Sequence, residues 1–217
     1  MSIEELLENN RRWVDHCTSD DPAFFRRIAS QHKPRYLYIG CSDARVPVNV
    51  LTQTGPGDLF VHRNVANLVV PTDANLLAVL HYAIDVLEVQ DVIVCGHEGC
   101  GGVRAALHTG APLMVEHWLA GVRHTARLHR QELDRLPDEE ARLRRLVELN
   151  VVEQLCNLSR TPQIQSAWRR GATLRLHGLV YGLHTGRLRR LGPVMDGHLG
   201  QHADAEHVVA RMLQAHG

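Results

Sequence analysis

Two short clusters of reactive side chains are the most informative feature of this 217-residue sequence. The first runs from Cys41 to Arg45 (Cys-Ser-Asp-Ala-Arg), and the second is His97-Glu-Gly-Cys100. Two cysteine sulfurs and one histidine nitrogen are a soft ligand set that suits zinc. A zinc ion held by three protein ligands keeps a fourth position for water or substrate, as catalytic sites do. We therefore expect Cys41, His97 and Cys100 to bind one catalytic zinc ion.

Asp43 is the candidate for the fourth zinc ligand, and Arg45 influences whether Asp43 reaches the metal. Two thiolates already cancel the 2+ charge of zinc, so a bound Asp43 would make the centre anionic and would take the position of water. The guanidinium of Arg45 is able to hold a carboxylate in a bidentate pair. Many Asp-x-Arg pairs are only surface ion pairs worth less than about 1 kcal/mol. Because this pair adjoins a zinc ligand, we expect Arg45 to hold Asp43 away from the metal.

The elements that must position these clusters follow an α/β pattern. Apolar strands at residues 36–40 and 92–96 each end in glycine directly before a ligand. Neighbouring parallel strands end at the same edge of a sheet, where open sheets bind ligands. The alternation of strands and helices predicts a central, mostly parallel β-sheet with an antiparallel edge strand, flanked by helices. Further strands are expected at 59–62, 173–180 and 187–191, and helices at 3–16, from Pro22, at 74–88 and over most of 112–170. A short helical turn is expected at 47–53, and a loop that enters a helix at 99–107.

We expect one domain with three parts. Residues 1–34 form an N-terminal helical arm, residues 35–192 an α/β core, and residues 193–217 a C-terminal tail. The apolar stripe of the first helix either packs on its own domain or reaches to another subunit, and periodicity is compatible with both.

The composition is that of an ordinary globular protein, with 44% hydrophobic and 22% charged residues. Because 24 basic residues balance 24 acidic ones, we expect no nucleic-acid partner and no attraction to a membrane surface. No apolar run approaches the roughly 20 residues of a membrane span. Five cysteines, an odd number, and an acidic N-terminus without a secretory pattern predict a cytoplasmic location.

Three motifs together resemble the β-class carbonic anhydrases. They are Cys41-Ser-Asp-Ala-Arg-Val-Pro47, Phe60-Val-His-Arg-Asn-Val-Ala-Asn67 and Gly96-His-Glu-Gly-Cys-Gly-Gly102. The three motifs in this order and at these spacings are highly specific. The resemblance runs from the N-terminal helix to about Tyr181-Gly182 and is strongest to the bacterial enzymes.

The resemblance implies a zinc lyase that reversibly hydrates carbon dioxide to bicarbonate and a proton. Zinc-bound hydroxide would attack the carbon, Asp43 would orient that hydroxide, and Arg45 would fix Asp43. Other parts of the site would be an apolar substrate pocket near Phe60 and Val65, and oxyanion donors at Gly101 and Gly102. The two glycines are equally compatible with close helix–strand packing. The resemblance also implies a homodimer or homotetramer, with the N-terminal helix reaching across subunits.

One subgroup of this family is regulated by bicarbonate. In its inactive form the aspartate replaces water on zinc, and bicarbonate in a separate pocket favours that form. The pocket residues would be Tyr38, Arg63 and Tyr181. The subgroup has tryptophan at the position of Tyr38, and tyrosine keeps an aromatic wall and a polar tip but changes the geometry of the donor. We expect switching with an altered sensitivity to bicarbonate.

Three other functions compete with this interpretation. One is a hydrolase of the same fold that acts on a carbon dioxide analogue such as carbonyl sulfide or carbon disulfide. Another is a non-catalytic zinc or thiol sensor, which would not need the Asp43–Arg45 pair. The third uses Cys100 as a nucleophile with His97, although zinc would occupy both side chains. His198 and His202 have helical metal-ligand spacing, but they lie in a Gly-rich tail and receive no role.

Overall fold

The computed structural model describes residues 1–197, and the chain divides into two compact units, residues 1–33 and the part from Pro34 onward. The first unit holds α1 (Ile3–Asp20) and α2 (Phe24–Ser30). Trp13 packs edge-on against Phe24 and Phe25, at ring distances of 6.5 and 5.3 Å. Helix α2 begins two residues later than expected, because the Asp21 carboxylate accepts the N–H of Ala23 and shapes a turn before the helix.

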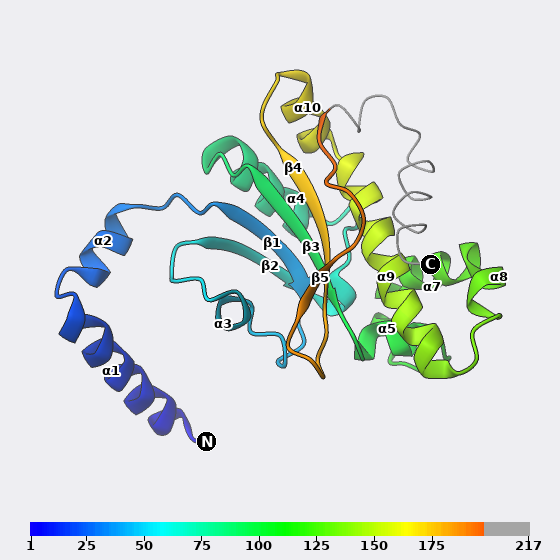
Figure 1. The fold of residues 1–217 in the computed structure, drawn as a ribbon, viewed down its shortest axis with the longest axis horizontal. Helices are drawn as coiled ribbons and strands as arrows, with labels where there is room; N and C mark the ends of the chain where they lie inside the picture. Colours follow the sequence, from blue (N-terminus) through cyan, green and yellow to red (C-terminus); the bar gives the residue numbers. More distant parts are fainter. Residues whose placement is uncertain (198–217) are drawn as a thin grey trace. The chain divides into compact units, whose positions relative to one another are not determined.

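The second unit is built on a five-stranded sheet with the order β2-β1-β3-β4-β5 (Figure 1). Its strands are β1 (Tyr36–Cys41), β2 (Leu59–Asn64), β3 (Asp91–His97), β4 (Arg175–Tyr181) and β5 (Leu188–Arg190). The first four strands in the sheet order are parallel, and β5 pairs antiparallel with β4. The expected mostly parallel sheet with an antiparallel edge strand is therefore confirmed.

The register of the sheet brings the two ligand clusters to one edge. Cys41 ends β1 and His97 ends β3, and these strands are neighbours in which Gly40 pairs with Cys95. His97 in turn pairs with Tyr181, the last residue of β4. Three strands thus bring candidate site residues to the same carboxyl edge, and for Cys41 and His97 this agrees with the strand-end argument from the sequence.

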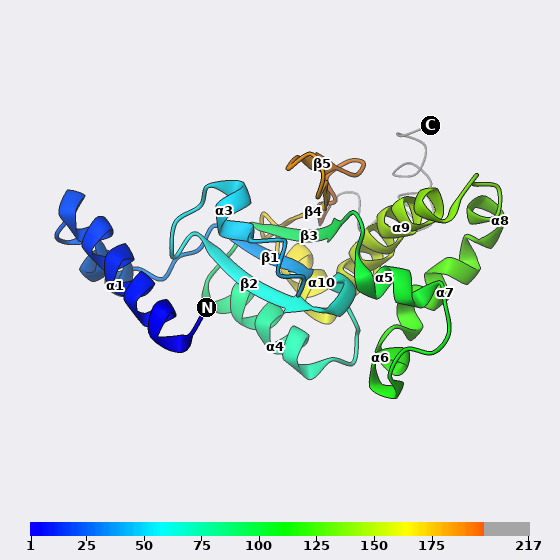
Figure 2. The ribbon, with the colours of Figure 1, turned by 90° about the horizontal axis from the view of Figure 1, so that it is seen from below.

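Helices cover the two faces of the sheet unequally. In Figure 2, α3 (Val48–Thr52) lies on one side of the strands and α4 (Ala74–His81) on the other. The α4 side holds the main core, to which α5 (Gly101–Ala106), α9 (Glu139–Ser159) and α10 (Pro162–Arg169) also contribute. The α3 side has a small buried cluster of Tyr38, Val48 and Cys95. We refer to this thinly covered side as the α3 face.

Two helical regions differ in detail from the sequence expectation. The helix expected over 74–88 is α-helical only to His81, and a π turn follows at Tyr82–Val86. The region 112–170 is divided into five helices, because the chain also breaks at Leu119 and His129. Hydrophobic periodicity does not distinguish such breaks from a continuous helix. The additional helices are α6 (Leu113–Trp118), α7 (Ala120–Leu128) and α8 (Arg130–Leu133).

Two further expectations concern the membrane and the C-terminus. Within residues 1–197, no helix combines the length and the apolar character that crossing a bilayer requires. Most of the expected C-terminal tail, including the pair His198 and His202, lies outside the described residues.

Helix α9 lies against the sheet at points where the strands carry glycine. A methyl group at Gly178 in β4 would come 2.7 Å from Leu155 Cδ1 and 3.3 Å from Val151 Cγ1. A methyl group at Gly96 in β3 would come 2.7 Å from Val151 Cγ2. Glycine is therefore required for the close approach of α9 to both strands.

We expect Gly178→Ala to destabilise the protein by about 1–3 kcal/mol, because the added methyl overpacks the α9–sheet interface. Gly121 in α7 is the matched control, because nothing lies within 4 Å of a methyl group there. Gly121→Ala should leave stability unchanged or raise it by up to about 1 kcal/mol. Thermal unfolding of both variants measures the difference, and equal midpoints would contradict the close packing of α9.

Candidate metal centre

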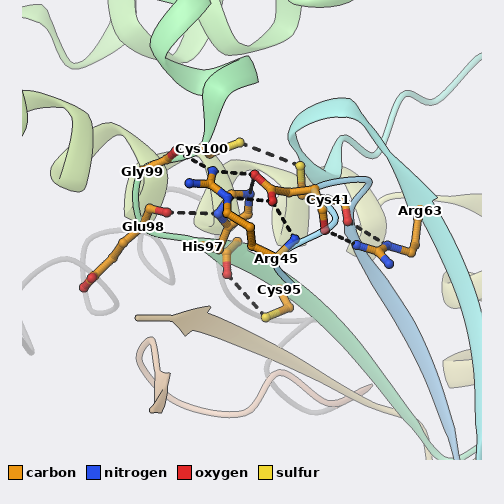
Figure 3. Close-up of polar contacts among 10 residues, drawn as sticks. Cys41, Arg45, Arg63, Cys95, His97, Glu98, Gly99 and Cys100 are labelled. Carbon is orange, nitrogen blue, oxygen red and sulfur yellow. Dashed lines mark hydrogen bonds and ion pairs between the residues drawn. The ribbon is translucent and has the colours of Figure 1, made fainter. Parts of the chain in front are cut away.

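Three buried side chains meet at the carboxyl edge of the sheet. Cys41 ends β1, His97 ends β3, and Cys100 is the N-cap of α5. Their ligand atoms all lie within 4.8 Å of one another, and the two sulfurs are 3.8 Å apart (Figure 3). Among residues 1–197 these are the only histidine, cysteine or acidic side chains grouped closely enough to hold a metal ion. The three expected ligands therefore come together.

The orientation of His97 fits a metal ligand. Its Nδ1 lies 2.9 Å from the carbonyl oxygen of Glu98, so this nitrogen carries the proton and donates it. Nε2 is then left with a free lone pair. This atom is buried and has no hydrogen-bond partner in the described part of the chain. A buried polar atom without a partner beside two sulfurs is what a tetrahedral zinc site would satisfy.

The two thiols depend on each other electrostatically. The hydrogen bond from Cys100 lowers the pKa of Cys41, and the same contact raises the pKa of Cys100. Backbone N–H groups of Gly102 and Val103, in the first turn of α5, act on the Cys100 sulfur in the opposite direction and favour its thiolate. A divalent metal would allow both sulfurs to be thiolates.

Asp43 lies at the margin of the ligand set and is held by Arg45. The guanidinium donates to both carboxylate oxygens, at 2.9 and 2.6 Å, and the backbone N–H of Arg45 adds a third bond of 2.9 Å. These hydrogen bonds hold the pKa of Asp43 well below its usual range, so the carboxylate is ionised and only accepts. Its Oδ2 lies 3.7 Å from His97 Nε2. The structure thus contains the expected Asp43–Arg45 pair, with Asp43 outside the three-ligand group.

Arg63 supports the segment that carries Cys41 and Asp43. Its Nε donates to the Cys41 carbonyl oxygen at 2.8 Å, and its Nη2 donates to the Asp43 carbonyl oxygen at 2.6 Å (Figure 3). Two donors of one rigid guanidinium therefore fix the backbone on both sides of Ser42.

The residues expected to form a bicarbonate pocket share one face of the sheet. Tyr181 packs against the buried cluster that contains Tyr38. Because Gly40 pairs with Arg63 and Tyr38 with Val61 in parallel register, Arg63 is on the same face as Tyr38. The Tyr38 hydroxyl is buried with no hydrogen-bond partner among the described residues, and burial raises the pKa of Tyr38 well above its usual value. The α3 face therefore holds an unpaired hydroxyl near a guanidinium.

The residues expected around the substrate are placed in different ways. Val65 lies beside Gly102, where a methyl group would come 2.8 Å from Val65 Cγ1. Phe60 pairs with Leu37, four residues before Cys41, which puts it about 13 Å along the sheet from that ligand. Its ring contacts Tyr82 instead, at 5.8 Å. Within one chain, the structure does not bring Phe60 and Val65 together.

The two glycines of the α5 turn also differ in their surroundings. A methyl group at Gly101 would meet nothing within 4 Å, whereas Gly102 packs against Val65 and Ala66. Close packing, the other role considered for these glycines, therefore applies to Gly102. Its N–H is directed at the Cys100 sulfur, and an oxyanion role for Gly101 and Gly102 stays a prediction.

Sequence reasoning missed two residues, Asn150 and Gln154, that support a loop next to the three ligands. Residues 65–69, which we call the 65–69 loop, follow β2 and begin with a single 3₁₀ turn at Val65–Asn67. Buried polar side chains of α9, Asn150 and Gln154, bind this loop. Their spacing of four residues inside an otherwise apolar stretch of a long helix is the signal that could have identified them.

Known proteins with similar sequences share one enzyme class. A family profile described as carbonic anhydrase matches residues 36–188. A carbonic anhydrase of Emericella nidulans is 41% identical over 188 residues, which are 87% of this chain and 82% of the relative. A carbonic anhydrase of Pseudomonas aeruginosa is 40% identical over 172 residues, 77% of each protein. Because the fungal and the bacterial relative are equally similar, the expected preference for bacterial enzymes is not confirmed.

Solved structures agree with the sequence comparison. A β-carbonic anhydrase of Coccomyxa, solved with acetazolamide, superposes with a TM-score of 0.88 at 36% identity and covers 95% of each chain. One of two tetrameric β-carbonic anhydrases of Sordaria macrospora gives a TM-score of 0.84 at 36% identity, covering 88% of this chain and 98% of that one. The Cys41–His97–Cys100 group provides the donors for zinc in such an enzyme. The chain therefore belongs to the β-class carbonic anhydrase family.

Proposed function

We propose that this chain catalyses the reversible hydration of carbon dioxide at the Cys41–His97–Cys100 centre, with Asp43 orienting the attacking water. The observation that carries the proposal is the position of the Asp43 carboxylate. Arg45 fixes it with three hydrogen bonds, and it lies 3.7 Å from the His97 nitrogen without belonging to the ligand group. A carboxylate placed beside a metal and kept off it is suited to act on a fourth ligand.

The residues divide the chemistry between them. Zinc would supply Lewis acidity that makes water a better nucleophile, and because two thiolates cancel its charge, activity should favour moderately alkaline pH. Cys41 and Cys100 contribute two negative charges and His97 a neutral nitrogen. The ionised Asp43 accepts a hydrogen bond from the attacking water, so that the oxygen lone pair is free to face the carbon of carbon dioxide. Arg45 keeps Asp43 in that position.

The competing functions explain less of this arrangement. A zinc or thiol sensor gives no reason for three hydrogen bonds between Arg45 and an acid beside the metal. A Cys100 nucleophile would need the His97 nitrogen as a base, whereas that nitrogen faces two sulfurs as a ligand does. Hydrolysis of carbonyl sulfide or carbon disulfide would use the same centre, so we test it with the same protein.

We expect Asp43→Asn to lower kcat/KM for carbon dioxide hydration by about 100-fold or more, because an uncharged amide is a weaker acceptor and loses the Arg45 ion pair. Zinc should remain near one ion per chain. Asp134→Asn, at an exposed acid paired with Arg130, is the control and should be unchanged. Stopped-flow hydration with zinc analysis measures both quantities, and carbonyl sulfide or carbon disulfide replaces carbon dioxide in a parallel assay.

Two results would contradict the assignment. Wild-type hydration rates in Asp43→Asn would remove Asp43 from the mechanism, and loss of zinc in this variant would make Asp43 a metal ligand.

Cys41→Ala should lose zinc and activity together. Zinc binding by the wild type without hydration at pH 8.5 would favour the sensor.

We further propose that bicarbonate regulates this enzyme, as in the switchable subgroup, through Tyr38, Arg63 and Tyr181. Two observations support this. The Tyr38 hydroxyl is a buried donor without a partner in residues 1–197, and Arg63 donates to the carbonyl oxygens of Cys41 and Asp43. Bicarbonate that accepts hydrogen bonds from Arg63 would compete with these carbonyls. The released segment would then let Asp43 leave Arg45 and replace water on the metal.

Tyr38→Phe should weaken inhibition by added bicarbonate several-fold, because it removes one donor and keeps the ring. The kcat/KM for hydration at low bicarbonate should stay unchanged, since Tyr38 is outside the ligand group. Initial rates across pH 7–9 with increasing bicarbonate are the measurement. Identical inhibition of variant and wild type would exclude Tyr38, and activity independent of bicarbonate in the wild type would exclude the switch.

The assembled protein is proposed to be a homodimer or homotetramer. Helix α1 buries none of its residues, and the apolar side chains of Ile3, Leu6, Leu7 and Trp13 are between 43 and 67% exposed. Tyr82, the ring neighbour of Phe60, is also 45% exposed. One solved relative is described as tetrameric. A second copy that covers these side chains could also bring Phe60 to a substrate pocket, which its own chain does not do.

Light scattering should give the mass of a dimer or a tetramer, and Leu7→Glu should shift the protein toward smaller species because the charge opposes burial of the α1 stripe. Glu8→Gln, at a partly exposed neighbour on α1, is the control. A wild-type protein that is monomeric at micromolar concentration would contradict the proposal.

A cytoplasmic location is also proposed. All five cysteines are free, and the sulfurs of Cys41 and Cys100 lie 3.8 Å apart. In an oxidising compartment this pair would be at risk of forming a disulfide and losing its metal, so a reducing environment suits the site.

A further inference from the structure

The 65–69 loop adopts a backbone conformation that needs external support. Ala66 and Asn67 have φ values of +67° and +49°, in the left-handed region that residues other than glycine rarely enter. Asparagine tolerates this region better than most residues, but alanine does not. Two consecutive residues of this kind persist only where surrounding contacts enforce the conformation.

Side chains outside α9 fix the two ends of the loop. Asn64 accepts the N–H of Leu68 at 2.7 Å and donates to the carbonyl oxygen of the same residue at 2.8 Å. The indole nitrogen of Trp118, in α6, donates to the carbonyl oxygen of Val65 at 2.8 Å. These bonds define where the loop begins and where it closes.

Helix α9 holds the middle of the loop with two buried amides. Asn150 donates to the carbonyl oxygen of Ala66 at 3.0 Å, and Gln154 accepts the N–H of Val69 at 2.8 Å. Gln154 also donates to the Asn150 side-chain oxygen at 3.0 Å, which orients both amides. Both side chains are almost completely buried. Burying an amide costs free energy unless it is hydrogen-bonded, and the bonds that satisfy Asn150 and Gln154 go to the 65–69 loop and to each other.

The loop in turn contacts the elements that carry both metal-binding sulfurs. The N–H of Ser42, next to Cys41, donates to the carbonyl oxygen of Asn64 at 2.9 Å, just before the loop. On the other side, a methyl group at Gly102 would come 3.2 Å from the Ala66 Cβ, so the loop packs against the first turn of α5. The loop therefore lies between the two cysteine-bearing segments.

We propose that Asn150 and Gln154 are positioning residues for the metal centre: they hold the 65–69 loop against Cys41 and the first turn of α5, and so fix the separation of the two sulfurs. Hydrogen-bonded neighbours of ligands commonly set the affinity of a metal site. The proposal rests on Cys41, His97 and Cys100 as ligands and is independent of the role of Asp43.

The test compares metal binding by Asn150→Leu, Gln154→Leu and Trp118→Phe with that of the wild type. Competition with a chelator gives the zinc affinity, and the sulfur-to-metal charge-transfer absorption of the Co²⁺-loaded protein reports the thiolates directly. Leu149→Ala is the matched control, because Leu149 is a buried residue of α9 that has no side-chain hydrogen bond to give. Trp118→Phe removes one hydrogen bond from a partly exposed side chain, so it keeps the test valid if the α9 variants do not fold.

We expect Asn150→Leu and Gln154→Leu each to bind zinc about 10-fold or more weakly, with a shifted charge-transfer band, and Trp118→Phe to show a smaller change of the same sign. Leu149→Ala should lower the unfolding temperature without changing either metal signal. Wild-type affinity and absorption in all folded variants would overturn the proposal, and so would equal changes in Leu149→Ala. A wild-type protein that binds neither metal would instead overturn the metal centre itself.

Discussion

Two thiols buried 3.8 Å apart are the constraint on which the rest of this site depends. Two thiolates in that position repel each other, and only a cation between them allows both to lose their protons. The surroundings provide partial compensation, because backbone N–H groups of Gly102 and Val103 act to lower the pKa of Cys100 and that of Ala66 acts to lower the pKa of Cys41. The third ligand, His97, is oriented by the Glu98 carbonyl oxygen so that its free nitrogen joins the sulfurs.

The same charge balance explains why Asp43 must be restrained. Zinc with two thiolates and one imidazole would be neutral and would attract a further carboxylate only weakly. The Asp43 carboxylate lies only 3.7 Å from His97 Nε2, however, so without a restraint it would compete with water for the metal. Arg45 offers the carboxylate a bidentate partner, and Arg63 holds the backbone that carries it. In the proposed mechanism, the active and the inhibited form differ in the position of the Asp43 side chain, and two arginines hold the active position.

Much of this site could be predicted from the sequence, because two of the candidate ligands directly follow predicted strands. The apolar runs before Cys41 and His97 predict parallel strands, and parallel register alone brings those residues to one edge. The side chains of Asp43 and Arg45 are close enough in sequence to pair without knowledge of the fold. Phe60 shows the limit of this reasoning: it belongs to a matching motif, yet register places it beside Leu37 and far from Cys41.

Long-range supports were not predictable in the same way. Asn150 and Gln154 lie more than 80 positions from the loop residues that they bind, and the hydrogen bonds require α9 to pack across Gly96 and Gly178. The helix breaks at Leu119 and His129 are likewise not recorded by hydrophobic periodicity.

A crystal structure of the zinc-loaded protein at pH 8.5 without bicarbonate tests the central claim most directly. We expect the metal to be bound by Cys41, His97 and Cys100, with a solvent molecule as the fourth ligand and Asp43 still paired with Arg45. Asp43 bound to zinc under these conditions, or zinc bound without either cysteine, would contradict the account.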